Sequence, residues 1–234
     1  MLGVGKIYGS RDRNDLLRGF GSARLDGDLD IASVNIGTGN TNWDRHVKVA
    51  SGVPFTGTGD VVVTNGVPAY PFTVTMQNGA NTATGSIKVA KVEGDAETAL
   101  YFANGANWAG TVVAGNVALT NLTDVATAAT ATFGTLDLAA DFPIRVWKGN
   151  GVYTADAINV GAFVAHGGKL SPVMMSDGED FDKGDSFVVG KVAKGATLPA
   201  VATGWAVKAR PIDGDDAYDE IVLKSGVGFQ IIIR

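Results

Sequence analysis

The residues best suited to chemistry lie in the segment SDGEDFDKGD, residues 176–185, which holds five carboxylates within ten positions. A calcium EF-loop needs oxygen ligands at positions 1, 3 and 5 and glycine at position 6. Counting from Asp177 places Phe181 at the fifth position, and counting from Asp180 places Gly184 there, so both registers fail. Because tight chain reversals favour Asp and Gly, we interpret the segment as a solvated turn, with an irregular calcium site as the alternative.

A second acidic segment, PIDGDDAYDE at residues 211–220, has the same character. The two segments could form one electronegative rim if they lie at the same end of a sheet, and otherwise they are two independent turns. A hydrolytic pair of carboxylates must face each other across a cleft, with one pKa raised by burial. Carboxylates in glycine-bearing turns are expected to stay solvated and ionised. We therefore expect no catalytic residue in either segment.

Other catalytic and metal-binding patterns have little support. The chain has no cysteine, which excludes thiol nucleophiles, Cys-ligated zinc and disulfides. Two histidines, His46 and His166, are too few for a His₃ zinc site, and neither adjoins a nucleophile motif such as G-x-S-x-G. The glycine-rich stretches lack the GK[ST] ending of a phosphate-binding loop. We expect a protein that is not an enzyme and that uses no cofactor and no metal.

Aromatic side chains offer one further binding chemistry. They could form a platform on which sugars stack, or they could be half-buried residues of strands. The residues concerned are Trp43, Trp108, Trp147, Trp205, Tyr70, Tyr101 and Tyr153.

Composition indicates a chain of short strands joined by tight turns. The 234 residues include 32 glycines, and only 18% are charged. The formal charge of −5 argues against a nucleic-acid partner. No apolar run reaches the roughly 18 residues that span a bilayer, and the first twenty residues lack the apolar region of a signal peptide. We expect no membrane partner and folding in the cytoplasm.

Alternation of apolar and polar residues predicts the strands. In FPIRVWK, Phe142, Ile144 and Val146 share one face, and RHVKVA alternates in the same way. The dipeptides Asn65-Gly66 and Asn78-Gly79 suit type I′ turns, because both residues tolerate positive φ. The predicted fold is all-β, with one or more antiparallel β-sandwich or barrel-like domains and an extended N-terminal arm.

We divide the chain into three parts. Residues 1–40 are a partly extended arm, residues 41–135 a β-rich domain or half-domain, and residues 136–234 a C-terminal β domain. The arm is either a frayed terminus or a segment that becomes ordered against a neighbouring subunit. Its basic residues are the candidate contacts with a neighbouring subunit or other partner: Lys6, Arg11, Arg13, Arg18 and Arg24.

The last third of the chain resembles the capsid decoration (cement) proteins of tailed bacteriophages. The resemblance lies in a segment of the type I-x-x-G-x-h-V-x-x-G-G, where h is hydrophobic, followed by hVhGhA and a Gly-turn strand. The matching residues of the first part are Ile158, Gly161, Phe163, Val164, Gly167 and Gly168. Those of the second part are Val188, Val189, Gly190, Val192 and Ala193.

This resemblance implies a trimer on the outer surface of a capsid, bound to the major capsid protein. Such a subunit stabilises the assembled shell by its own binding free energy, and multivalent contact increases the effect. We therefore expect a non-enzymatic virion protein that is assembled in the host cytoplasm. The alternative is a carbohydrate-binding or adhesive β-module, such as a component of a head or tail fibre.

Overall fold

A computed structural model of the chain contains β-strands and no helix among the residues that it describes. The described residues are 46–49, 51, 54–66, 70–90, 93–94 and 97–226, together with the strand backbone at 5–9, 16–17, 23–25, 29–33 and 45. The all-β prediction is confirmed.

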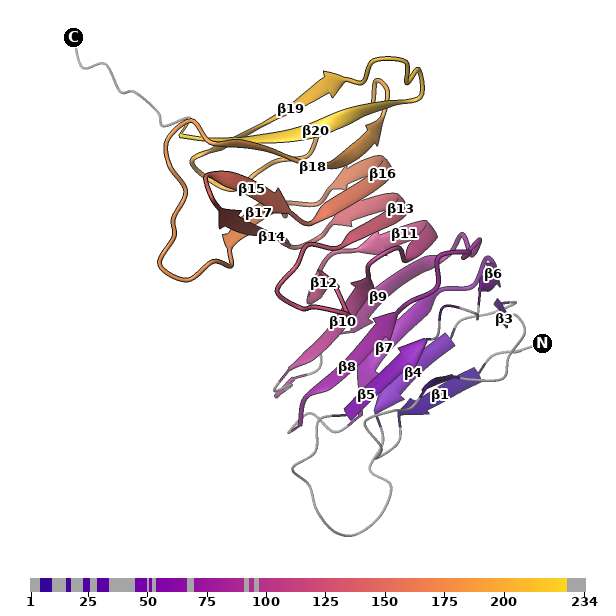
Figure 1. Ribbon diagram of the computed structural model, residues 1–234. Helices are drawn as coiled ribbons and strands as arrows, with labels where there is room; N and C mark the ends of the chain where they lie inside the picture. Colours follow the sequence, from indigo (N-terminus) through magenta and orange to yellow (C-terminus); the bar gives the residue numbers. More distant parts are fainter. Residues whose placement is uncertain are drawn as a thin grey trace.

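One long sheet runs through the whole molecule, from the indigo strands to the yellow ones in Figure 1. Its ten strands, in spatial order, are β1 (Gly5–Gly9), β4 (Leu29–Ser33), β7 (Val61–Asn65), β9 (Ser86–Ala90), β11 (Asn107–Val113), β13 (Thr130–Leu138), β16 (Ala157–Ala165), β18 (Ser186–Ala193), β20 (Tyr218–Ser225) and β19 (Trp205–Pro211).

The described part of the chain also forms three smaller sheets. The five-stranded sheet has the order β12 (Val117–Thr120), β10 (Thr98–Ala103), β8 (Phe72–Met76), β5 (Arg45–Val49) and β2 (Leu16–Leu17). The three-stranded sheet has the order β15 (Val152–Ala155), β14 (Phe142–Gly149) and β17 (Leu170–Met174). The two-stranded sheet pairs β3 (Ala23–Leu25) with β6 (Phe55–Gly57).

The strands pair mainly in parallel, so the predicted antiparallel sandwich or barrel is wrong. Every neighbouring pair from β1 to β18 in the long sheet is parallel, and so are the pairs of the five-stranded sheet. Parallel neighbours need a long connection between them, and here the chain passes through a smaller sheet before it returns. The result is a stack of similar turns, a parallel β-solenoid-like arrangement.

The core lies between the long sheet and the smaller sheets. Phe142, Ile144 and Val146 of β14 are fully buried, as their alternation predicts, and Val47 and Val49 of β5 are buried too. The largest buried side chains form edge-to-face pairs along the stack: Phe55 with Trp108, Phe102 with Phe133, and Phe133 with Phe142.

A column of glycines runs across the long sheet, next to β9 and within β11, β13 and β16. A Cβ atom added to Gly85 would lie 2.1 Å from the carbonyl oxygen of Gly59, and one added to Gly110 would lie 2.1 Å from that of Gly85. The column continues with Gly134 and Gly161, whose added Cβ atoms would lie 1.9 Å and 2.6 Å from carbonyl oxygens of the preceding turn. No larger residue fits where successive backbones approach so closely.

Polar side chains at the corners hold successive turns together. The Asn107 amide accepts a hydrogen bond from the Asn81 backbone N–H (2.7 Å) and donates one to the Asn81 carbonyl (3.0 Å). In the next turn, Asn104 accepts a hydrogen bond from the Thr130 N–H at 2.9 Å. These bonds satisfy backbone groups that the strand ladders leave unpaired.

The Asn-Gly dipeptides have a different role from the one predicted. Asn65-Gly66 and Asn78-Gly79 do not join antiparallel strands, because β7 pairs in parallel with β9 and β8 with β10. A two-residue hairpin does occur at Asn150-Gly151, where φ is 53° and 75° and β14 pairs antiparallel with β15. Sequence reasoning passed over this dipeptide, although it has the residues that a type I′ turn requires.

Strand pairing also crosses the predicted divisions of the chain. The boundary at residues 135 and 136 falls inside β13, which pairs with β11 and β16. Within residues 1–40, β1 pairs with β4, and β4 pairs with β7. In these strands the backbone of the predicted arm is part of the long sheet. The division into domains stays a prediction.

Candidate functional site

The two ends of the stack differ. At the N-terminal end, β1, β2 and β3 are each the last strand of a sheet, and each has one strand partner among the described residues. Figure 1 shows β1 and β3 at the end of the molecule where the N-terminus lies. Such edges present unpaired backbone N–H and C=O groups to their surroundings. We call these three strands the open end.

At the C-terminal end the strands become antiparallel. β18 pairs with β20, and β20 pairs with β19. The outermost strand, β19, carries Lys208, Arg210 and Pro211, all exposed. Charged residues and proline are the means by which proteins prevent an edge strand from pairing further. We call β18, β19 and β20 the cap.

An aromatic cluster joins the cap to the three-stranded sheet. Phe181 lies edge-on to Trp205, with ring centroids 4.8 Å apart, and Phe187 lies 5.5 Å from Trp205. Tyr153 of β15 stacks on Phe181 at 6.4 Å. Terminal units of stacked proteins need such closure, because they have a neighbour on one side only.

The first acidic segment lies over this cluster. Asp177, Glu179, Asp180 and Asp182 are exposed, which confirms the prediction of a turn in contact with water. The turn is also held in place, because the Lys148 ammonium lies 2.9 Å from Asp182 and 3.3 Å from Glu179. The hydrogen bond to Asp182 raises the pKa of Lys148 above its usual range. These contacts give the carboxylates a structural role.

The second acidic segment lies at the opposite end of the cap. β18 pairs with β20 in a register that sets Ser186 opposite Lys224 and Ala193 opposite Tyr218. The first segment precedes Ser186, whereas the second precedes Tyr218. The two therefore do not form one electronegative rim.

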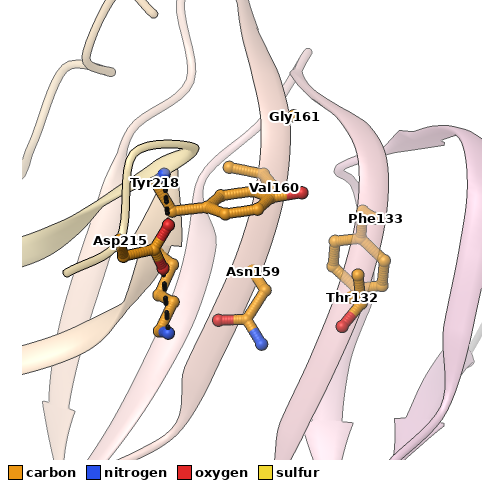
Figure 2. A pocket seen from close by; sticks show the side chains of 8 residues that line it. Thr132, Phe133, Asn159, Val160, Gly161, Asp215 and Tyr218 are labelled. Atoms are coloured by element: carbon orange, nitrogen blue, oxygen red, sulfur yellow. Dashed lines mark hydrogen bonds and ion pairs between the residues drawn. The ribbon is translucent and has the colours of Figure 1, made fainter. Parts of the chain in front are cut away.

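A groove opens where the second acidic turn overhangs the long sheet. Its volume is about 350 Å³, at the lower end of the range for small-molecule sites. Its floor includes Thr132, Asn159 and Lys191, which are cross-strand neighbours on β13, β16 and β18. Its wall includes Asp215 and Tyr218. Figure 2 shows the Tyr218 ring extending towards β16, with the Asn159 amide on the same strand.

Asp215 is the most constrained group in this groove. Its carboxylate accepts hydrogen bonds from the N–H groups of Ala217 (3.0 Å) and Tyr218 (3.1 Å). Lys191 lies 3.7 Å from the other carboxylate oxygen. The backbone hydrogen bond from Ala217 is the main reason why the pKa of Asp215 lies below its usual value. The side chain is therefore ionised and fixed in direction.

The two histidines do not line this groove and have partners of their own. His46 Nε2 lies 2.9 Å from the Thr75 hydroxyl, and burial lowers its pKa. His166 Nδ1 lies 2.7 Å from a carboxylate oxygen of Asp137 on a neighbouring strand. Neither contact includes a nucleophile with a base and an oxyanion donor, the arrangement that acyl transfer needs.

One carboxylate is completely buried. Asp156 has no exposed side-chain surface and accepts hydrogen bonds from the Arg145 guanidinium at 2.7 Å and 3.0 Å. It also accepts one from the Ala129 N–H at 2.9 Å. The guanidinium in turn lies 5.0 Å from the Trp147 ring. Sequence reasoning missed this ion pair because it passed over the hairpin at Asn150-Gly151, whose register brings Asp156 beside Arg145.

The predicted contact residues are only partly placed. Lys6 lies in β1 and Arg24 in β3, both at the open end, while Arg11, Arg13 and Arg18 lie outside the described residues. Their role in contacts stays a prediction.

Among the described residues, the aromatic side chains predicted as a sugar platform do not gather into one surface, and Trp43 lies outside the described residues. Trp108 is fully buried, Trp205 belongs to the cap cluster, and Trp147 lies beneath Arg145. Among the described residues, no group of three or more His, Cys, Asp or Glu side chains is arranged to hold a metal ion. The same part of the chain contains no helix long and apolar enough to cross a membrane.

A repeat in the sequence could have revealed the stack. The tetrapeptide NGAN begins at Asn78 and again at Asn104, and each copy is followed by a glycine of the glycine column, Gly85 or Gly110. The backbone and side chain of Asn81 and Asn107, 26 positions apart, bond directly. Spacings of this length are typical of stacked repeats.

Comparison with protein-family models, with curated proteins and with solved structures gave no match to this chain.

Proposed function

We propose that the protein is a non-enzymatic structural protein that associates with a second copy of itself through the open end of its strand stack. The observation that carries this proposal is the difference between the two ends. β1, β2 and β3 are each the last strand of a sheet, whereas the other end has a cap.

Backbone hydrogen bonding would drive this association. Adding a strand to a free edge gives a row of main-chain hydrogen bonds, which supply affinity. The edges of β1, β2 and β3 each offer such a row. The edge of the cap disfavours such pairing, because β19 carries Lys208, Arg210 and Pro211.

The narrower role predicted from the sequence remains part of the proposal. In that role the protein binds the outer surface of an assembled phage capsid, contacts the major capsid protein and acts as a trimer in the virion. The placement of Lys6 and Arg24 on edge strands of the open end is compatible with such contacts.

Two proline variants test the association. Successive N–H groups of a strand point to opposite edges, so one of Ile7→Pro and Tyr8→Pro removes a donor from the free edge of β1 and the other removes one that faces β4. The variant that loses the free-edge donor should no longer self-associate, and its melting temperature should stay near that of the wild type. The variant that loses the donor facing β4 should have a lower melting temperature.

Native mass spectrometry and circular dichroism supply the two measurements. The proposal fails if the wild-type chain is monomeric at every concentration, or if both variants keep the wild-type oligomeric state. The capsid role has its own test, cosedimentation with purified tailed-phage capsids. Binding there should be saturable and should weaken when the five basic residues of the predicted arm are changed to glutamine.

A further inference from the structure

The groove between β13, β16, β18 and the turn before β20 contains polar groups that are not committed elsewhere. The Thr132 hydroxyl, the Asn159 amide and the Tyr218 hydroxyl make no hydrogen bond within the described part of the chain. Thr132 and Asn159 are direct neighbours in the sheet register, and Asn159 is the neighbour of Lys191. Adjacent strands lie about 4.8 Å apart, so these side chains form a short, evenly spaced row.

The wall of the groove adds an aromatic face. Tyr218 is 41% exposed, a large fraction for an aromatic side chain that lines a hollow. Figure 2 shows its ring lying across the groove towards Val160, above the row of polar side chains. A tyrosine ring presents an apolar body with a polar tip. The groove therefore combines one apolar face with several hydrogen-bonding groups.

The charges in the groove balance each other. Lys191 lies 3.7 Å from the ionised Asp215, whose direction is fixed by two backbone N–H groups. An anion would have to compete with Asp215 for Lys191, which disfavours phosphate and nucleic acid. A peptide strand would find no free edge, because β13, β16 and β18 are all paired on both sides.

We propose that this groove binds a neutral oligosaccharide. The apolar C–H face of a sugar ring packs against the Tyr218 ring. The Asn159 amide, which can both donate and accept, bonds to neighbouring sugar hydroxyls. Thr132 extends the row along the floor, and Asp215 accepts a hydrogen bond from a further hydroxyl. Backbone pairing holds the floor of the groove, and the Asp215 turn holds its wall. Binding therefore costs little conformational entropy of the protein.

Titration of the full chain with a panel of soluble hexasaccharides tests the site. The probes are cellohexaose, maltohexaose and mannohexaose, with hexagalacturonate as an acidic counterpart, and binding is followed by calorimetry. We expect saturable binding of at least one neutral probe and weaker binding of the acidic one. Tyr218→Ala should weaken binding about tenfold, from the loss of one aromatic contact, and Asn159→Ala should weaken it as well.

Trp147→Ala is the matched control, because it removes another aromatic side chain outside the groove and should leave the affinity unchanged. Melting temperatures show that each variant is folded. The proposal is overturned if no neutral probe binds at millimolar concentration, if the acidic probe binds best, or if Tyr218→Ala binds as well as the wild type. These outcomes do not depend on β1, so they are independent of the test of self-association.

Discussion

The side-chain amide of Asn107 hydrogen bonds to both the N–H and the carbonyl of Asn81, at 2.7 Å and 3.0 Å. One side chain thus takes the place of a strand neighbour for a residue 26 positions earlier. The bond ties one turn of the stack to the next at a corner, where the regular ladder is interrupted. Corner residues of this kind keep successive strands in register.

Replacing this amide should destabilise the stack. Asn81 is 1% exposed, so Asn107→Ala leaves its backbone groups without partners and without water. We expect the free energy of unfolding to fall by about 1–3 kcal/mol, as measured by denaturant unfolding. Asn121→Ala is the control, because the Asn121 amide bonds to Thr127 in an exposed turn. Equal effects of the two substitutions would contradict the structural role of Asn107.

The glycine column predicts a second loss of stability. A Cβ atom at Gly134 would lie 1.9 Å from the carbonyl oxygen of Ala109, so Gly134→Ala must push two strands apart. We expect a loss of about 1–3 kcal/mol or more, the usual cost of overpacking. Gly149→Ala, with no atom within 4 Å of the added Cβ, should be nearly neutral. Thermal unfolding of both variants gives the comparison, and a neutral Gly134→Ala would refute the close approach.

The buried ion pair predicts a larger effect. Arg145→Met leaves the Asp156 carboxylate buried without its cation. Removing one partner of a buried pair costs about 3–5 kcal/mol, and chemical denaturation should show this. Arg210→Met breaks a pair with Glu220 in which Arg210 is 58% exposed, and exposed pairs contribute at most about 1 kcal/mol. Similar losses for the two variants would show that Asp156 is not buried as described.

His46 should make stability depend on pH. Burial, with a smaller effect from Lys48, lowers its pKa in the folded chain below the usual 6.5. At pH values between the lowered pKa of the folded chain and the ordinary value, the unfolded chain binds more protons. The free energy of unfolding therefore falls as the pH drops below about 6.5. We expect the melting temperature to decline over this range, and His46→Gln to reduce the decline. An unchanged pH profile in the variant would exclude His46 as its source.

The sequence predicts where strands lie better than how they pair. The alternation of Phe142, Ile144 and Val146 correctly predicts a strand with one buried face. Alternation is more typical of antiparallel sheets, since most parallel strands are buried on both faces. In this chain the strands of the parallel long sheet alternate too, as β7 does with its buried Val61 and Val63, so the same pattern arises with the opposite pairing.

The candidate sites depend on contacts that sequence spacing alone does not reveal. Thr132, Asn159 and Lys191 become neighbours only once the turns of the stack are aligned. The local prediction for residues 176–185 succeeded because Asp and Gly specify turns directly. Its contact with Lys148 depends on the neighbouring sheet and could not be predicted in that way.

Hydrogen exchange of β1 tests the central proposal most directly. Amide exchange across Gly5–Gly9 is compared at low and high concentrations of the intact protein, with β13 and β19 as internal references. Pairing at the open end should slow exchange in β1 as the concentration rises and leave β13 and β19 unchanged. Identical exchange in β1 at both concentrations, or protection that appears in β19 instead, would contradict association through the open end.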